Sequence, residues 1–270
     1  MSAGLDDARA FAESVAGVVE RAMPARTVWT PGEASEPWPA LDDALLAVDW
    51  AEVATDPELV EFAALGAVEL GRQGAPLHAV DGLLGGSPLS GGLVRCLVPD
   101  RTVLVIENGP ALRSVITAEP VPAADGLDVH RVVELGPAAP IDPSEWETAR
   151  GAWFAAGVGY LAGVGEAALD LTVAYVRDRA AFGTTLGGLA PVQQLLAGAA
   201  TAVRGVSLVA SADPGAEALA HSGPAIAGAC AACQQVTGAI GYTLEYPLHR
   251  FTQRARALSV WNETLLDLLS

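Results

Sequence analysis

Two strings of residues in the second half of the chain decide its fold. The first runs Arg179-Ala-Ala-Phe-Gly-Thr-Thr-Leu186 and is soon followed by Leu189-Ala-Pro-Val-Gln-Gln-Leu-Leu-Ala197. The second runs Gln235-Val-Thr-Gly-Ala-Ile-Gly-Tyr-Thr-Leu-Glu-Tyr-Pro247. Each string places glycine and turn residues within a long apolar stretch, so we expect helices on both sides of it.

The whole region from Asp142 to the end is predicted to be a four-helix bundle. Its pattern is helical, with breaks near 183–188, 212–213 and 238–241. Asp142-Pro143 is a typical helix start, because Asp caps the free N–H groups and Pro fits the first turn. Asp56-Pro57 and Asp213-Pro214 carry the same signal, which predicts helices from 57, 143 and 214.

The region before the bundle divides in two. Residues 1–84 are predicted to form a shortened N-terminal helical domain, and residues 85–142 a small β domain that leads into the bundle of 143–270. The β domain contains short β-branched segments at 93–98, 102–107, 114–121 and 128–135, separated by turn residues. The predicted fold class is mainly α with a small β domain: N-terminal helices, a short antiparallel sheet and a C-terminal four-helix bundle.

Composition and charge exclude several classes of function. Of the 270 residues, 51% are apolar and 17% are charged, and the net charge is −17 with every basic side chain an Arg. A chain without a basic stripe is a poor nucleic-acid binder, and its acidity disfavours an anionic membrane surface. Residues 144–270 carry a net charge of only −3. A half that is so apolar and carries so few charges must pack against its own core or against a partner.

The cysteine count and the N-terminus predict a cytoplasmic protein, and the spacing of the three Cys and four His residues predicts no metal site. The Cys count is three, an odd number, and the N-terminus is acidic and polar rather than a secretory signal. Cys230-x-x-Cys233 lies among small residues and is interpreted as a packed helix face. The uncharged stretches 180–203 and 218–244 contain Pro, Gly and Gln pairs, which favours buried bundle helices over membrane spans.

The two strings resemble those of the acyl-CoA dehydrogenase family, in which the first reads Arg-x-x-Phe-Gly and the second Gln-x-x-Gly-Gly-x-Gly-Tyr before Glu-Tyr-Pro. The resemblance is good over 143–270 and weak over 1–142. It implies removal of two hydrogens from an acyl-CoA: a Glu takes the α-proton, and the β-hydrogen leaves as hydride to FAD. FAD is therefore the implied cofactor and an acyl-CoA the implied substrate.

The resemblance assigns Arg179, Phe182, Gln235 and Gly238 to the cofactor. In the family these strings mostly bind the ADP half of an FAD held by the neighbouring subunit. An Arg guanidinium can make a forked contact to pyrophosphate. A glycine lets backbone N–H groups approach a phosphate.

Each assignment also has a purely structural alternative. Arg179 can pair with Asp178 or Glu166 instead of binding a cofactor. Phe182 can belong to the core, and Gly238 can end one helix before the next begins.

The catalytic carboxylate of the family is missing. The family carries its Glu either in the last helix or in the first helix of the bundle, and these positions here read Asn262 and Trp153. Neither side chain accepts a proton at neutral pH. Glu263 is one residue away from the first position, about 100° round a helix, so it should point elsewhere.

Glu245 is the remaining candidate base. Family members with a separate base also have a Glu there, which favours a structural pairing with Arg250 or Arg254. The β domain is short for holding a flavin ring, and Thr117-Ala-Glu-Pro120 is only an echo of the family's ring-binding stretch.

Some members of the family are built from two unlike chains in an α2β2 assembly, and this chain resembles the shorter, degenerate subunit. The leading hypothesis is a non-catalytic chain that completes the ADP site of FAD in a larger subunit. By analogy, such pairs often act on bulky acyl chains such as sterol side-chain CoA esters. Two alternatives remain: a self-sufficient homomeric dehydrogenase with Glu245 as base, and a scaffold subunit that binds no flavin.

Overall fold

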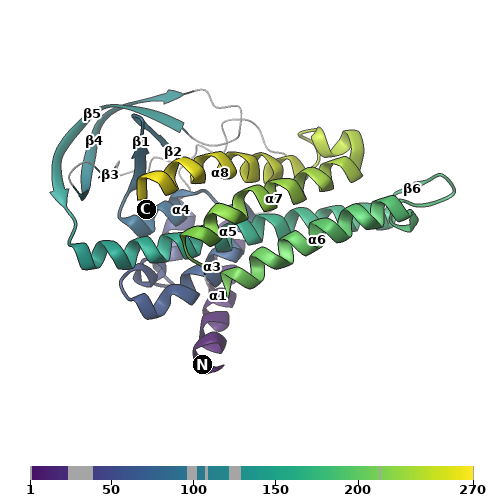
Figure 1. The fold of residues 1–270 in the computed structure, drawn as a ribbon, viewed down its shortest axis with the longest axis horizontal. Helices are drawn as coiled ribbons and strands as arrows, with labels where there is room; N and C mark the ends of the chain where they lie inside the picture. Colours follow the sequence, from purple (N-terminus) through teal and green to yellow (C-terminus); the bar gives the residue numbers. More distant parts are fainter. Residues whose placement is uncertain are drawn as a thin grey trace.

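The computed structural model describes residues 2–23, 39–95, 102–106, 109–121, 129–212 and 214–269. Long helices run along the main axis of the molecule (Figure 1). A small β-barrel lies at one end of these helices, and a two-stranded hairpin projects at the other. The two strings assigned to the cofactor (the cofactor strings) are residues 179–197 and 235–247. These strings and Asn262 lie in the same elongated set of helices.

The C-terminal half forms the predicted four-helix bundle. Its helices are α5 (Pro143–Asp178), α6 (Ala190–Ala210), α7 (Ala216–Thr237) and α8 (Leu248–Leu269), with short 3₁₀ turns at Leu186–Gly188 and Gly238–Tyr242 (η6). Two of the three breaks between these helices coincide with the strings at 179–197 and 235–247, and the third follows Ala210.

The N-terminal part is also helical. It contains α1 (Ser2–Ala22), α2 (Pro39–Leu46), α3 (Val60–Gln73) and α4 (His78–Asp81), with 3₁₀ turns at Trp50–Ala54, Pro57–Leu59 and Gly82–Leu84. Its apolar side chains share one continuous core with the bundle. The division at residue 84 therefore stays a prediction, because this core does not separate the two parts.

The Asp-Pro signals act as caps, with one difference from expectation. The Asp142 carboxylate accepts hydrogen bonds from the Ser144 hydroxyl at 2.6 Å and the Ser144 N–H at 2.8 Å. These bonds hold the pKa of Asp142 below its ordinary value. Asp56 caps in the same way, but residues 57–59 form a 3₁₀ turn and the α-helix begins only at Val60. Asp213 lies outside the described residues, and α7 begins at Ala216.

Glycines bring α3 and α5 into backbone contact. A Cβ added at Gly159 would lie 1.9 Å from the carbonyl oxygen of Ala64, and one at Gly163 would lie 2.0 Å from that of Val68. From the other side, a Cβ at Gly71 would meet the carbonyl oxygen of Tyr160 at 2.0 Å. Only glycine allows two helices to approach this closely, so these residues fix how the N-terminal helices sit on the bundle.

The β domain is a closed barrel rather than a simple antiparallel sheet. Its strands are β1 (Ser87–Ser90), β2 (Leu93–Arg95), β3 (Thr102–Ile106), β4 (Pro110–Val121) and β5 (Val129–Pro140), in the order β1-β2-β5-β4-β3. All pairs are antiparallel except β1 with β3, which is parallel and closes the barrel. Strand β1 could not be predicted, because a short Ser-Pro-Leu-Ser segment has neither β-branched residues nor alternation.

Strand alternation divides side chains between the barrel and the helical core. Val94, Val103, Val105 and Val115 form a small core inside the barrel. Successive side chains of a strand point to opposite faces, so Arg95, next to Val94, leaves the barrel and enters the helical layer.

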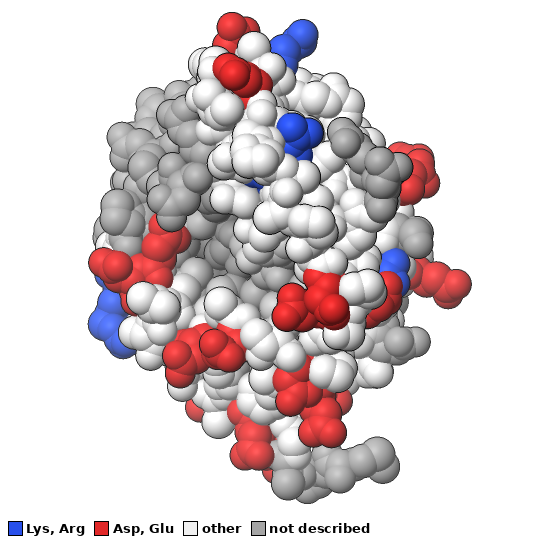
Figure 2. Space-filling model, turned by 90° about the vertical axis from the view of Figure 1, so that its left-hand side faces the viewer, with Lys and Arg blue, Asp and Glu red and all other residues white. Residues whose placement is uncertain are grey.

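Some sequence predictions fall outside the described residues. They are Cys96, one of the three cysteines, and the turn residues between predicted strands at 99–100 and 125–126. The face of the molecule that includes the barrel end carries scattered acidic side chains and few arginines (Figure 2). This distribution agrees with the strongly acidic first half of the sequence.

Among the residues that the structure describes, two helices pass a test of length and composition for a membrane span. Helix α5 is 83% buried in its most apolar window, as expected for the core helix of a bundle. Helix α6 is only 17% buried in its corresponding window. The test alone is weak support for a membrane span, but α6 does present an apolar face that this chain leaves uncovered.

Replacing Gly163 by Ala should destabilise the protein. The added methyl group has no space against Val68, so α3 and α5 must move apart at a cost of about 1–3 kcal/mol. Gly151→Ala in the same helix is the matched control, because a Cβ there meets nothing within 4 Å; it should stabilise by up to about 1 kcal/mol. Urea unfolding of both variants measures the difference, and equal stabilities would contradict the close helix contact.

Candidate functional site

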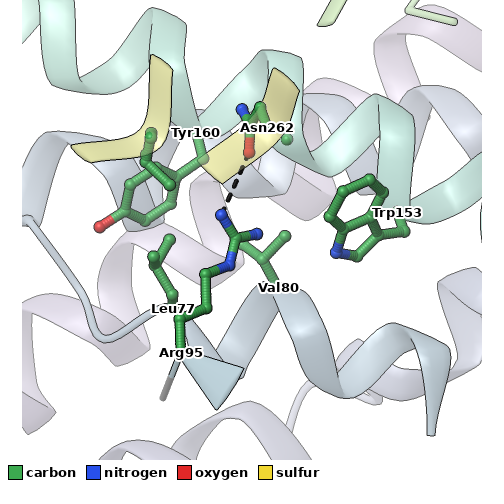
Figure 3. A pocket seen from close by; sticks show the side chains of 8 residues that line it. Leu77, Val80, Arg95, Trp153, Tyr160 and Asn262 are labelled. Carbon is green, nitrogen blue, oxygen red and sulfur yellow. Dashed lines mark hydrogen bonds between the residues drawn. The ribbon is translucent and has the colours of Figure 1, made fainter. Parts of the chain in front are cut away.

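The two positions predicted from the sequence to correspond to the family's catalytic Glu meet at one buried cavity. Trp153 comes from α5 and Asn262 from α8, and both line the same small space (Figure 3). The cavity measures about 10 Å³, which is about the room that one water molecule requires. The remaining lining is mostly apolar: Leu77, Val80, Gly157, Tyr160 and Leu258.

Arg95 fills the centre of this cavity. Its guanidinium donates to both oxygens of Asp81, at 3.1 and 2.9 Å, and to Oδ1 of Asn262 at 3.1 Å. The Trp153 indole N–H donates to the same Asp81 carboxylate at 3.0 Å. The Arg95 guanidinium also lies 5.8 Å from the centre of the Trp153 ring. Arg95 is 2% exposed and Asp81 0%, so the ion pair is fully removed from water.

This arrangement does not provide a general base. The Asp81 carboxylate is occupied by three hydrogen bonds, and a cation lies where a base would have to approach a carbon acid. Asn262 uses its oxygen to accept from Arg95. The cluster is thus a satisfied polar network of the kind that rigidifies a core.

Neither member of the ion pair was predicted from the sequence. Asp81 and Arg95 each stand alone within an apolar run, at 77–84 and 93–98. A single charged residue in a segment that becomes buried requires an opposite charge nearby. The sequence therefore already indicated that Asp81 and Arg95 each need a partner. The pairing itself was not available, because it depends on the placement of β2 against α4.

The first cofactor string forms a projecting arm. Strands β6 (Ala180–Ala181) and β7 (Thr184–Thr185) pair across a two-residue turn. Phe182 and Gly183 occupy that turn with φ of 55° and 81°, as a type I′ turn requires. Phe182 is 91% exposed, which excludes the core role considered for it.

Arg179 lies exposed at the base of the arm. Its backbone is bonded to Tyr175 and Leu186, but in the described part of the chain its guanidinium has no hydrogen-bond or ion-pair partner. The alternative pairing with Glu166 is not formed, because that carboxylate accepts from Arg72 at 2.7 Å and from Ser207.

The second cofactor string lies at the same end of the bundle, where α7 ends. Gln235 is exposed in the last turn of α7. Gly238 follows with φ 69°, and a Cβ there would meet nothing within 4 Å. The neighbouring Gln234 instead points inward and donates to the Gly241 carbonyl. The four residues assigned to the cofactor are thus presented to solvent around this end of the molecule.

Glu245 is remote from the buried cavity. It is exposed and precedes α8, and Asn262 lies 14 residues after the first residue of that helix, about 21 Å along its axis. The expected pair with Arg254 is not formed, since the Arg254 guanidinium lies buried against the Tyr160 hydroxyl at 3.3 Å. A base at Glu245 could not act at the position of Asn262.

The C-terminal half matches a known domain. The model of the acyl-CoA dehydrogenase C-terminal domain matches residues 155–262. The matched residues thus form a domain of the acyl-CoA dehydrogenase C-terminal type, and they make up less than half of the chain. The match begins inside α5 and ends at Asn262, so it includes both cofactor strings. No curated protein matches the sequence.

Solved structures share the fold over nearly the whole chain at low identity. The ChsE4-ChsE5 complex from Mycobacterium tuberculosis has a TM-score of 0.67 at 16% identity, with 96% of each chain covered. The Tcur3481-Tcur3483 steroid ACAD variant has a TM-score of 0.63 at 15% identity, covering 98% of this chain and 97% of that one. A Mycobacterium smegmatis glutaryl-CoA dehydrogenase in complex with FADH2 has 0.63 at 14% identity, covering 95% and 90%.

The residues at the end of the bundle that carries the arm fit the ADP half of an FAD, the cofactor that the sequence resemblance implies. Arg179 offers an exposed, unused guanidinium for a pyrophosphate, and the open space at Gly238 leaves room for a phosphate beside the backbone. The expected echo of a ring-binding stretch, Thr117 to Pro120, lies in β4 and pairs with β5. FAD supplies the hydride acceptor when it is bound, and these residues would hold its ADP end.

The described residues include no group of three His, Cys, Asp or Glu side chains that could hold a metal ion. Cys230 and Cys233 are buried as free thiols. Burial raises the pKa of both, and the charge of Cys233 adds to the effect on Cys230. They behave as packing residues of α7.

These two thiols should not react in the folded protein. With raised pKa values they remain protonated at pH 8, so a Cys96→Ser variant should react with a thiol reagent only after unfolding. The folded state holds the two thiol protons more tightly than the unfolded chain does. The free energy of unfolding that these neutral thiols support is therefore fully present below about pH 8.5 and is lost as the pH rises above it. Urea midpoints from pH 7 to 10 should fall less in a Cys230→Ala/Cys233→Ala variant. Rapid labelling of the native protein would contradict this assignment.

Removing only the Arg95 guanidinium should be more damaging than removing the whole ion pair. Arg95→Ala leaves a buried, unpaired Asp81 and should cost about 3–5 kcal/mol. The double variant Asp81→Leu/Arg95→Met leaves no buried charge and should unfold with a smaller loss. Arg72→Ala is the control, because its pair with Glu166 is partly exposed and should be worth about 1 kcal/mol or less. Equal losses in the single and double variants would contradict the pairing.

Proposed function

We propose that this chain is the non-catalytic subunit of an FAD-dependent acyl-CoA dehydrogenase and completes the ADP part of the cofactor site in a larger subunit. The observation that carries the proposal is a contrast between the two ends of the bundle. The end that should hold a base is closed by an ion pair, whereas the end with the cofactor strings is open to solvent. The reaction class is removal of two hydrogens across a carbon–carbon bond of an acyl-CoA thioester, in the cytoplasm.

The closed cavity argues against an independent enzyme. An acyl thioester needs room beside a base for its α-carbon, and Arg95 leaves only about 10 Å³ there. Neither Asn262 nor Trp153 can accept the proton. The base and the acyl pocket are therefore assigned to the partner chain.

The arm supports a role across an interface. An aromatic side chain that is 91% exposed at the tip of a hairpin is a typical anchor for a second protein surface. Arg179 at the base of the same arm is available to a phosphate that this chain does not itself enclose. We infer that both residues reach the FAD of the neighbouring subunit.

Helices α6 and α7 offer the surface for that subunit. Leu208 on α6 is 52% exposed, and the space above Gly198, Gly205 and Gly228 is open. Small residues beside exposed leucine allow another helix pair to pack closely, as in obligate interfaces. Two of the structural neighbours are named as pairs of chains, ChsE4-ChsE5 and Tcur3481-Tcur3483, which supports an α2β2 assembly. The steroid in the second name supports a bulky acyl chain such as a sterol side chain.

The flavin content of the assembled protein tests the proposal. We expect the chain purified alone to be colourless, and co-expression with a longer acyl-CoA dehydrogenase chain encoded beside it to give one flavin per pair. Arg179→Ala should then lower the flavin content of the pair, because the pyrophosphate contact is lost. Arg131→Ala, an exposed arginine on the barrel, is the control and should leave the content unchanged.

Other outcomes favour the alternatives. A yellow homo-oligomer with one flavin per chain, whose turnover is abolished by Glu245→Gln, would establish the self-sufficient enzyme. A stable pair whose flavin is indifferent to Arg179→Ala would establish the scaffold subunit without a flavin contact.

A further inference from the structure

The acceptor groups around Arg95 have the form of a ligand site that is already occupied. Three of them face the guanidinium: the two oxygens of Asp81 and Oδ1 of Asn262. The Trp153 ring lies beside the cation. Asp81 belongs to α4, Trp153 to α5 and Asn262 to α8. Arg95 comes from the barrel on β2, and Figure 3 shows it together with Trp153 and Asn262.

The cage is held in place without Arg95. Trp153 donates to Asp81 directly, which links α5 to α4 independently of the guanidinium. The Tyr160 hydroxyl, one wall of the same cavity, bonds the Ala75 carbonyl just before α4. Asn262 lies within α8, packed on α5 and α7. The acceptors are therefore preorganised by the helices, and only the cation comes from elsewhere.

We propose that Arg95 is a built-in plug: its side chain acts as an intramolecular ligand of a guanidinium-binding cage and thereby closes this chain's own acyl pocket. The second half of this statement rests on the proposed function. The cage prefers a planar cation with several N–H donors, because Asp81 accepts two parallel bonds and Asn262 a third in the same plane of donors. An acyl chain or a thioester carbonyl offers no such donors.

Chemical complementation tests the cage directly. Arg95→Ala keeps Cβ, so the atoms it removes correspond to N-ethylguanidinium. At millimolar concentrations, well below those that denature proteins, N-ethylguanidinium should raise the unfolding midpoint of Arg95→Ala progressively as its concentration passes the dissociation constant. N-ethylurea, which has the same shape without the charge, should have no such effect.

Matched variants separate the cage from general cation effects. The wild-type chain, whose cage is filled, should not respond to N-ethylguanidinium. Arg113→Ala should not respond either, because the Arg113 guanidinium bonds a backbone carbonyl on the barrel and no carboxylate cage. Arg95→Ala/Asp81→Asn should lose most of the response, since the paired carboxylate is gone.

If Arg95→Ala folds poorly, the same compound should raise its refolding yield in proportion, and Arg95→Ser is a second variant whose short side chain also leaves the space of the arginine stem empty. An equal response in wild type, Arg113→Ala and Arg95→Ala, or no response in either Arg95 variant, would overturn the plug. These readouts use no flavin and no partner chain, so they fail or succeed separately from the subunit assignment.

Discussion

The rest of the structure depends on the backbone contact between α3 and α5. Gly71, Gly159 and Gly163 allow two helices to touch without side chains between them. This contact fixes the end of α3, and the chain that follows carries Ala75 to the Tyr160 hydroxyl and Asp81 to the Trp153 indole. Helix α5, which is long and weakly amphipathic, therefore packs against the N-terminal helices as well as against the other helices of the bundle.

The buried ion pair joins the barrel to these helices. Val94 belongs to the barrel core, and its neighbour Arg95 enters the helical core. Apolar strand residues such as Leu104 and Val129 pack into the same helical core, and Arg95 adds the buried charge to this contact. Buried ion pairs add little net stability compared with apolar residues of the same size, but they specify one arrangement strongly, because any other leaves charge unpaired. Trp153 and Asn262, the positions at which the sequence predicts the family's base, are here part of a satisfied polar network.

The four-helix bundle could be predicted from the sequence because the signals for its helix ends are local. Glycine-rich breaks and the Asp142-Pro143 cap act within one turn of chain, and the helices end and begin near them. The barrel closure was missed, since β1 has no β-branched alternation and pairs with a strand that is parallel to it. At the site, the absence of a Glu at Asn262 and Trp153 was readable from the family pattern. The replacement by Arg95 and Asp81 was not, because it depends on how a barrel strand meets two helices distant in sequence.

The two-residue turn at the tip of the arm has a consequence for the speed of dissociation. Phe182 holds a left-handed backbone conformation that costs a non-glycine residue about 1 kcal/mol or more, and this cost is met when the chain folds. An unstructured loop would instead lose about 1–2 kcal/mol of backbone entropy per residue at the moment of contact. A preformed hairpin loses little conformational entropy when it binds a partner. The affinity gained in this way appears mainly as a slower rate of dissociation. Strain stored in one turn would thus lengthen the lifetime of any complex in which the arm is engaged.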